Sequence, residues 1–85
     1  MAQRIRRTMF AIVVFSCAMI GEAGCPIDRV EWLALDRSAS LCAPEVQAAA
    51  LLTWSGENQD RKAVVTACLR QEQVPELIVR LTLPR

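Results

Sequence analysis

The sequence predicts a mostly α-helical fold: a small domain of two or three helices that follows a cleaved signal peptide. Three observations support this prediction: an apolar run near the start of the chain, prolines that suit helix starts, and apolar residues at helical spacing in the second half. The chain has 85 residues, which leaves room for one small domain after such a leader. We expect the signal peptide over residues 1–24 and the domain over residues 25–85.

The N-terminal segment has the layout of an export signal. Three arginines within the first seven residues give a basic start, and an apolar run over Met9–Ile20 follows. A secretory signal has this basic start, an apolar stretch of about 7–15 residues and a small-residue cleavage site. A membrane-spanning helix needs about 20 apolar residues, so the shorter run favours a removed signal over an anchor. A buried helix of a cytosolic protein would alternate polar and apolar faces, whereas only Ser16 interrupts this run.

Two kinds of cleavage fit the end of this segment. Small residues up to Ala23 suit a general signal peptidase that cuts after that residue. Ala23, Gly24 and Cys25 also resemble the last three positions of the lipobox of bacterial lipoprotein precursors, although Glu22 stands where that motif has an aliphatic residue. The resemblance covers residues 1–25. It implies that Cys25 carries a lipid and that this lipid attaches the protein to a membrane.

Two helices are expected in the first half of the mature domain. The first covers Ile27–Arg37, where apolar residues recur at helical spacing after Pro26. The second starts at Pro44 and continues through Trp54, a segment rich in the strong helix formers Ala and Leu. Gly56 fits the left-handed position that caps such a helix.

The third expected helix begins after Asn58, which suits an N-cap, and extends to about Glu72. Val64, Ala67 and Cys68 share one face of it at i, i+3 and i+4.

The tail over residues 76–83 differs, because its apolar residues alternate with a period of two and include β-branched side chains. This alternation predicts a short C-terminal strand that pairs elsewhere. An apolar tail packed on the helices is the alternative.

The cysteines suggest one disulfide. Cys17 lies in the predicted signal, so the mature chain keeps Cys25, Cys42 and Cys68. Lipidation of Cys25 would account for the odd number and leave Cys42 and Cys68 to pair in an oxidising compartment. In an antiparallel helix hairpin, the start of one helix lies beside the end of the next, which would bring these two cysteines together. A Cys25–Cys42 bond and a disulfide-linked homodimer remain alternatives.

Composition argues against several functions. The chain has no histidine, the usual general base near neutral pH, so we predict no catalytic residues and no enzyme activity. The cysteines are widely spaced, unlike paired zinc ligands, so no metal or other cofactor is expected. Lys and Arg total 10 and Asp and Glu total 9, without a basic patch, so nucleic acid is not an expected partner.

Trp32 and Trp54 are candidate interface residues, because tryptophan is enriched at binding hot spots, but a core position is favoured for each, because an aromatic side chain can bury a large area. The favoured function is a small exported protein of the periplasm or membrane-anchored cell envelope, with a non-catalytic interaction or structural role toward an unidentified envelope protein. A freely secreted effector or inhibitor is one alternative. A cytosolic helix-turn-helix regulator, built on the two helices around Gly56, is another. The sequence indicates no oligomeric state.

Overall fold

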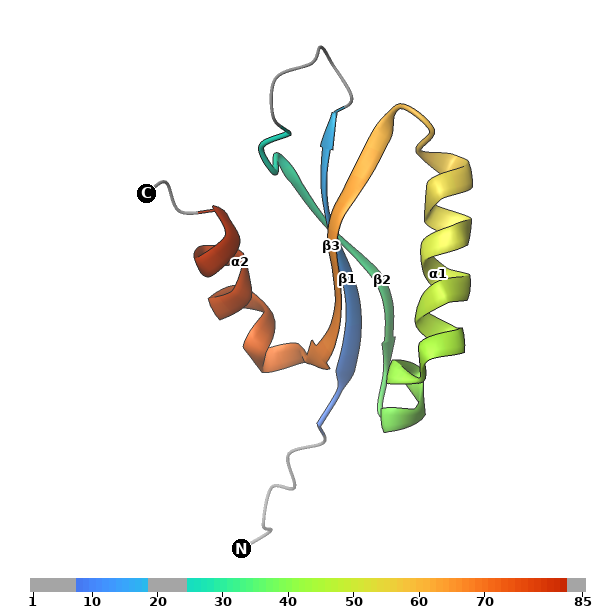
Figure 1. Ribbon diagram of the computed structural model, residues 1–85. Coiled ribbons are helices and arrows are strands. Elements are labelled where there is room, and N and C mark those ends of the chain that lie inside the picture. Colours follow the sequence, from blue (N-terminus) through green and yellow to red (C-terminus); the bar gives the residue numbers. More distant parts are fainter. Residues whose placement is uncertain (1–7, 19–24, 83–85) are drawn as a thin grey trace, which may run out of the picture.

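The computed structural model describes residues 8–18 and 25–82, which form an α+β fold (Figure 1). In chain order the elements are β1 (Phe10–Ala18), β2 (Arg29–Asp36), the 3-10 helix η1 (Ala39–Cys42), α1 (Pro44–Glu57), β3 (Arg61–Arg70), the 3-10 helix η2 (Gln71–Gln73) and α2 (Val74–Thr82). The prediction of a mostly α-helical domain of two or three helices is wrong, because a three-stranded sheet lies at the centre of the molecule. None of the helices in the described ranges has the length and apolar composition needed to cross a membrane.

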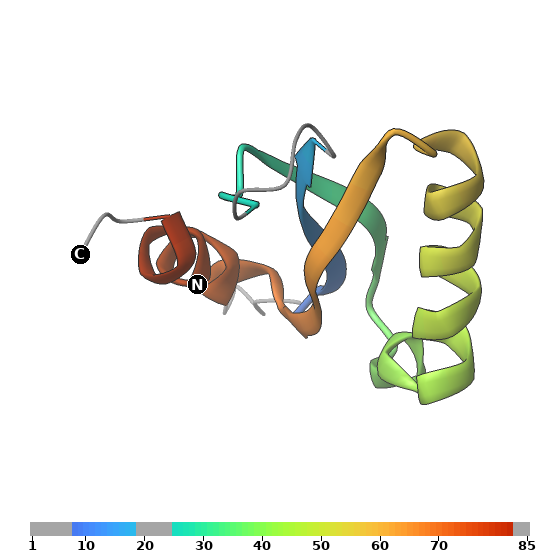
Figure 2. The ribbon, with the colours of Figure 1, turned by 45° about the horizontal axis from the view of Figure 1, so that its top comes forward.

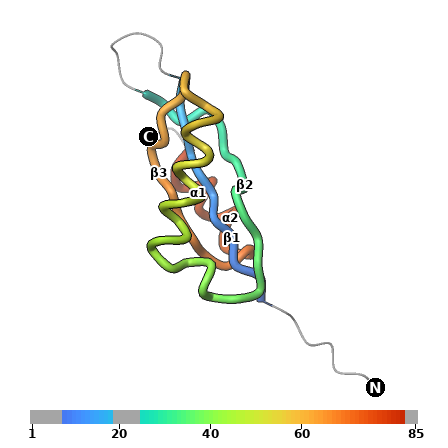
Figure 3. Tube along the Cα trace, turned by 90° about the vertical axis from the view of Figure 1, so that its right-hand side faces the viewer, coloured from blue at the N-terminus to red at the C-terminus, as the bar shows by residue number. Residues whose placement is uncertain are grey.

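The strands form one antiparallel sheet in the order β2-β1-β3, so β1 is central and β2 and β3 lie at the edges. α1 covers one face of this sheet and α2 covers the other, as Figures 2 and 3 show from two directions. Ile12 of β1 lies opposite Cys68, which is bonded to Cys42 just before α1. Even-numbered positions of β1 therefore face α1, and odd-numbered positions face α2.

β1 is the most deeply buried segment, and every residue from Ala11 to Ser16 is 0% exposed. Ala11, Val13 and Phe15 form the core with Val74 of α2. A strand that is covered on both faces needs apolar residues on both, so it reads as an unbroken apolar run. For this reason, the run predicted as the apolar part of a signal peptide contains the central strand. The arginine-rich start and the predicted cleavage positions, residues 1–7 and 19–24, lie outside the described residues.

The segment Ile27–Arg37, predicted as a helix, contains the edge strand β2 instead. A β-bulge explains the error. The register with β1 leaves Leu33 as an extra residue without a partner, which shifts the alternation of β2 by one position. Val30, Leu33 and Ala34 then fall at i, i+3 and i+4, a spacing that imitates one face of a helix.

The segment Asn58–Glu72, predicted as a third helix, is mostly strand β3. The β-branched run Val64–Thr66 is the signal that favours a strand. Helical spacing of its apolar residues outweighed that signal in the prediction, although β3 is only partly buried and its pattern is not a strict alternation. Since this segment is a strand, the second helix of a helix-turn-helix unit is not formed there.

The tail shows the reverse error, because the predicted C-terminal strand is helix α2. Val74, Leu77, Ile78 and Leu81 recur at i, i+3, i+4 and i+7, and the last three pack against the core that contains Val74. Pro75 lies in the first turn of α2, where its missing N–H does no harm.

The helix expected from Pro44 is present as α1, but it is longer than predicted. Gly56 lies inside this helix and does not cap it. The C-cap is Asn58, whose backbone N–H donates to the Ser55 carbonyl at 3.3 Å and whose side-chain amide donates to the Trp54 carbonyl at 2.8 Å. Asn58, predicted as the N-cap of a third helix, is thus the C-cap of α1.

Candidate functional site

Two disulfides lie within the described residues. The first joins Cys42 at the end of η1 to Cys68 in β3, with a Cα–Cα distance of 5.4 Å. These are the two cysteines that the sequence analysis pairs, although Cys68 lies on a strand and not on a helix. The bond holds the start of α1 against the sheet.

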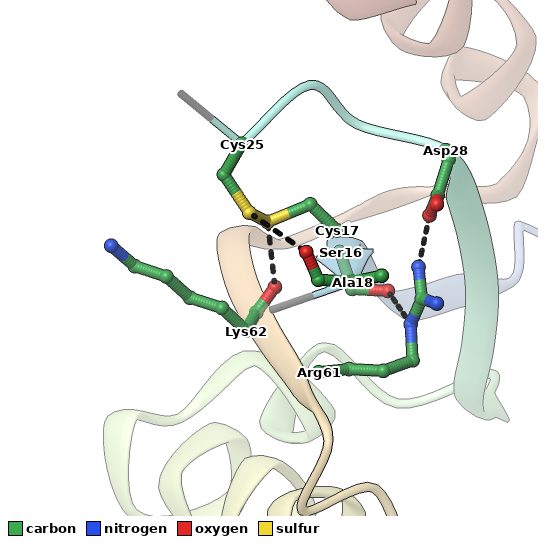
Figure 4. Close-up of a disulfide and its surroundings, with 7 residues drawn as sticks. All are labelled: Ser16, Cys17, Ala18, Cys25, Asp28, Arg61 and Lys62. Atoms are coloured by element: carbon green, nitrogen blue, oxygen red, sulfur yellow. Dashed lines mark hydrogen bonds and ion pairs between the residues drawn. A yellow bond between two sulfur atoms is a disulfide. The ribbon is translucent and has the colours of Figure 1, made fainter. Parts of the chain in front are cut away.

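The second disulfide joins Cys17 at the end of β1 to Cys25, with a Cα–Cα distance of 5.5 Å (Figure 4). The sequence predicts that Cys17 lies in a removed segment and that Cys25 is the odd cysteine. In the structure, no cysteine of the described residues is free. A cysteine sulfur in a disulfide cannot also form a thioether to a lipid, so this bond and lipidation of Cys25 exclude one another.

Arg61 fastens the same end of the sheet (Figure 4). Its side chain is only 8% exposed, its Nε donates to Ser16 Oγ at 3.0 Å, and its terminal nitrogen pairs with Asp28. One guanidinium therefore links the start of β3, the end of β1 and the residue before β2. A buried charge needs such partners, because an unpaired one is strongly destabilising.

Trp54 of α1 faces the sheet and is only 4% exposed. Its indole Nε1 donates to Glu31 Oε1 of β2 at 3.0 Å. Arg29 lies 3.5 Å from the same carboxylate oxygen. Trp54 thus occupies the core position that the sequence favours for it, and its hydrogen bond fixes α1 relative to β2.

A groove of about 440 Å³ runs between β2 and α1. It is lined by Glu31, Trp32, Leu33, Ala50, Thr53, Trp54, Glu57 and Asn58. Trp54 is buried at this groove, whereas Trp32 borders it but lies opposite Val13, so its side chain is on the α2 face of the sheet and 46% exposed. The groove has the volume of a small ligand site, which is typically about 300–1,000 Å³.

The chemistry of this groove suits binding. Two carboxylates, Glu31 and Glu57, accompany the indole ring of Trp54. Within residues 8–18 and 25–82, no group of three cysteine or carboxylate side chains is placed to hold a metal ion. Aromatic surface takes up apolar groups and attracts cations, and a carboxylate adds attraction for positive charge.

Comparisons of this chain with protein-family models, with curated proteins and with solved structures find no match. The groove residues therefore carry the functional interpretation. The residue types alone point to the two tryptophans, but not to Glu31 and Glu57 as groove residues. Glu31 precedes Trp32 directly and Glu57 follows Trp54 by three positions, but only the antiparallel packing of β2 beside α1 brings the four together.

Proposed function

We propose that the protein acts outside the cytoplasm as a small non-catalytic binding protein, and that the groove between β2 and α1 holds a segment of its partner. The observation that carries this proposal is the groove itself, in which Glu31 and Glu57 lie beside the fixed Trp54. Tryptophan is among the residues most enriched at binding hot spots.

The chemistry of the groove suggests the class of partner. Glu57 is exposed and Glu31 is half-buried, so a positive charge can approach both carboxylates at the groove. Leu33 and Ala50 add apolar lining. We therefore propose a protein segment in which a lysine or arginine is flanked by apolar side chains.

The two disulfides support the location, because they are compatible with an oxidising, exported compartment. The basic and apolar N-terminal pattern points the same way. The cell envelope, and the periplasm in particular, is the location that we propose. The Cys17–Cys25 bond favours a form held there by protein contacts or freely secreted over a form lipidated at Cys25.

The fate of the N-terminal segment is decisive for the mature form. Removal of residues 1–24 would remove β1, with which both β2 and β3 pair. It would also remove Cys17 and free Cys25 for a lipid. The folded binding protein therefore requires the segment Phe10–Ala18 to be retained.

Intact mass spectrometry of the exported protein distinguishes these fates. The full gene is expressed in a bacterium, spheroplasts are treated with trypsin, and the protein is recovered from each fraction without reduction. We expect a chain that retains β1, with both disulfides, on the protease-accessible side. A product that begins at Cys25 and carries a lipid would show a lipoprotein and reject the described sheet as its mature fold. Complete protection in spheroplasts would reject export.

Binding in the groove is tested with a defined probe. The probe is a capped tripeptide with lysine between two leucines, and the control peptide has glutamate in place of lysine. We expect the lysine peptide to shift the indole N–H signal of Trp54 in a ¹⁵N spectrum more than that of Trp32, whose side chain lies on the other face of the sheet. Glu57→Lys should weaken this binding, whereas Glu72→Lys, an exposed change on η2, should not. Equal shifts with both peptides would reject the proposed charge preference.

A further inference from the structure

The outer side of β2 has no partner strand among the described residues. β2 is eight residues long and lies at one edge of the sheet, with α1 on one face and α2 on the other (Figure 3). Two of its large apolar side chains are half exposed, Trp32 at 46% and Leu35 at 47%. An exposed apolar edge strand is a template for pairing with another strand.

The charges of β2 are complementary to those of a second β2 that runs in the opposite direction. When a two-fold axis passes through the middle of the strand, Arg29 lies opposite Asp36 of the second copy, once at each end. Val30 lies opposite Leu35 in the same register. Opposite charges and apolar side chains that face each other directly stabilise an antiparallel pair.

Because of the bulge at Leu33, residues that lie opposite each other in the β2–β2 pair point to the same face of the sheet. Residues directly opposite each other in an antiparallel pair lie on the same face of the sheet. Arg29 and Asp36 both lie opposite even-numbered positions of β1, and Val30 and Leu35 both lie opposite odd-numbered positions. Without the extra residue, strict alternation would place the members of each pair on opposite faces. A bulge often disfavours edge pairing, but at the centre of β2 it makes the self-pairing register consistent.

We propose that the protein is a homodimer in which the β2 strands of two copies pair in antiparallel orientation. The sheets of three strands then join into one sheet of six, in the order β3-β1-β2-β2-β1-β3. The two-fold axis is perpendicular to this sheet, so both α1 helices lie on the same face. The grooves between β2 and α1 then lie on either side of the new strand pair, and one partner with two basic segments can occupy both. The dimer itself does not depend on the proposed function.

Charge reversal tests this dimer. Sedimentation velocity of the oxidised full chain, over increasing concentration, should give twice the mass of the 9.4 kDa chain. Arg29→Asp places like charges opposite each other at both ends and should weaken association about tenfold or more, the equivalent of about 1.4 kcal/mol. The swap Arg29→Asp with Asp36→Arg restores opposite charges and should recover much of the affinity. Lys62→Glu, a charge reversal at an exposed position of β3, is the matched control and should leave the dimer unchanged.

Asp36 also accepts a hydrogen bond from the Arg37 backbone N–H at 2.6 Å, so its replacement can disturb the turn after β2. Arg29→Asp is therefore the primary variant, and circular dichroism checks its fold. A chain that stays monomeric at millimolar concentration would overturn the proposal. A dimer that Arg29→Asp leaves intact would also overturn it.

A nuclear Overhauser effect between copies gives an independent measurement. Val30 and Leu35 are five positions apart on one strand, which separates them by roughly 16 Å. In the proposed dimer they lie directly opposite each other across the two-fold axis. An isotope-filtered spectrum of mixed labelled and unlabelled protein should therefore show contacts between their methyl groups. A dimer without these contacts would overturn the β2 interface.

Discussion

The two edge strands of the sheet, β2 and β3, differ in how well each could pair with its own copy. Both run antiparallel to β1, and both carry a bulge. β3 has Arg61 at one end and Arg70 at the other, so antiparallel self-pairing would place two arginines opposite each other twice. β2 has Arg29 at one end and Asp36 at the other, so the same operation creates opposite pairs. Like charges on an edge strand are a known protection against pairing, and only β3 has this arrangement.

The bulges reinforce this difference through their positions. In β2 the extra residue, Leu33, lies at the centre, so residues that meet in a self-pair share a face. In β3 the extra residue, Val64, lies off centre. Val65 and Thr66 would meet in the middle of a β3 self-pair, but they lie opposite Phe15 and Val14 and hence on different faces. The charges and the bulge position thus both disfavour self-pairing of β3, and both permit self-pairing of β2.

The largest expected effect comes from breaking the strand on which both edges depend. Val13 of β1 is 0% exposed and belongs to the core. Val13→Asp would place a charge in an apolar site without a partner, so we expect loss of the fold and of both edges. Circular dichroism and the dispersion of a ¹⁵N spectrum measure this loss. Val79→Asp, the same change at a position that is 51% exposed on α2, should remain folded. A folded Val13→Asp variant would contradict the central place of β1.

The disulfides give the next largest effect, and each belongs to one edge. Cys42–Cys68 attaches α1 to β3 and closes a sequence separation of 26, whereas Cys17–Cys25 lies on the approach to β2 and closes a separation of 8. In the chain-entropy relation, the longer loop contributes about 3.5 kcal/mol and the shorter about 2.6 kcal/mol. The two double Cys→Ser variants should therefore differ in free energy of unfolding by about 1 kcal/mol, measured with urea. Greater loss from the shorter loop would show that the β2 end depends on its disulfide for more than loop closure.

The sequence predicts some of these features from local signals and misses others that depend on pairing. α1 is predicted because Pro44, the Ala/Leu content and the first-turn Glu45 are local properties of a helix. The segment of β2 misleads because the bulge at Leu33 becomes visible only when the strand pairs with β1. α2 misleads because Leu77 and Leu81 fit both a period of two and a helical repeat.

The candidate site shows the same limit. Trp32 and Trp54 attract attention as residue types, but neither their spacing nor their neighbours places them together. The contact that forms is between Trp54 and Glu31, and it depends on a chain reversal through η1, held by the Cys42–Cys68 bond. The sequence predicts that Cys42 and Cys68 meet in a hairpin of two helices, whereas in the structure they join the start of α1 to the strand β3.

A smaller effect is expected from the contact that fixes α1 to β2. Trp54→Phe keeps an aromatic ring in the core but removes the indole N–H that donates to Glu31. Because Glu31 is partly exposed, we expect a loss of about 1 kcal/mol in the free energy of unfolding. Glu31→Gln keeps an acceptor for the indole and should lose less. An equal loss in both variants would indicate that the charge of Glu31, and not the hydrogen bond alone, stabilises this junction.

The smallest effect is expected from a substitution that gives β3 the end charges of β2 but leaves the bulge of β3 in place. Arg70→Asp would place an aspartate opposite Arg61 of a second copy, which imitates the charge pattern of β2. We expect no new association for two reasons. Val65 and Thr66, which would lie opposite each other in a β3 self-pair, still point to different faces of the sheet. Arg61 already binds Ser16 and Asp28. Sedimentation velocity should give the same masses for this variant as for the unchanged chain. Assemblies larger than a dimer would show instead that charge alone keeps the β3 edge unpaired, and that the position of the bulge does not decide which edge pairs.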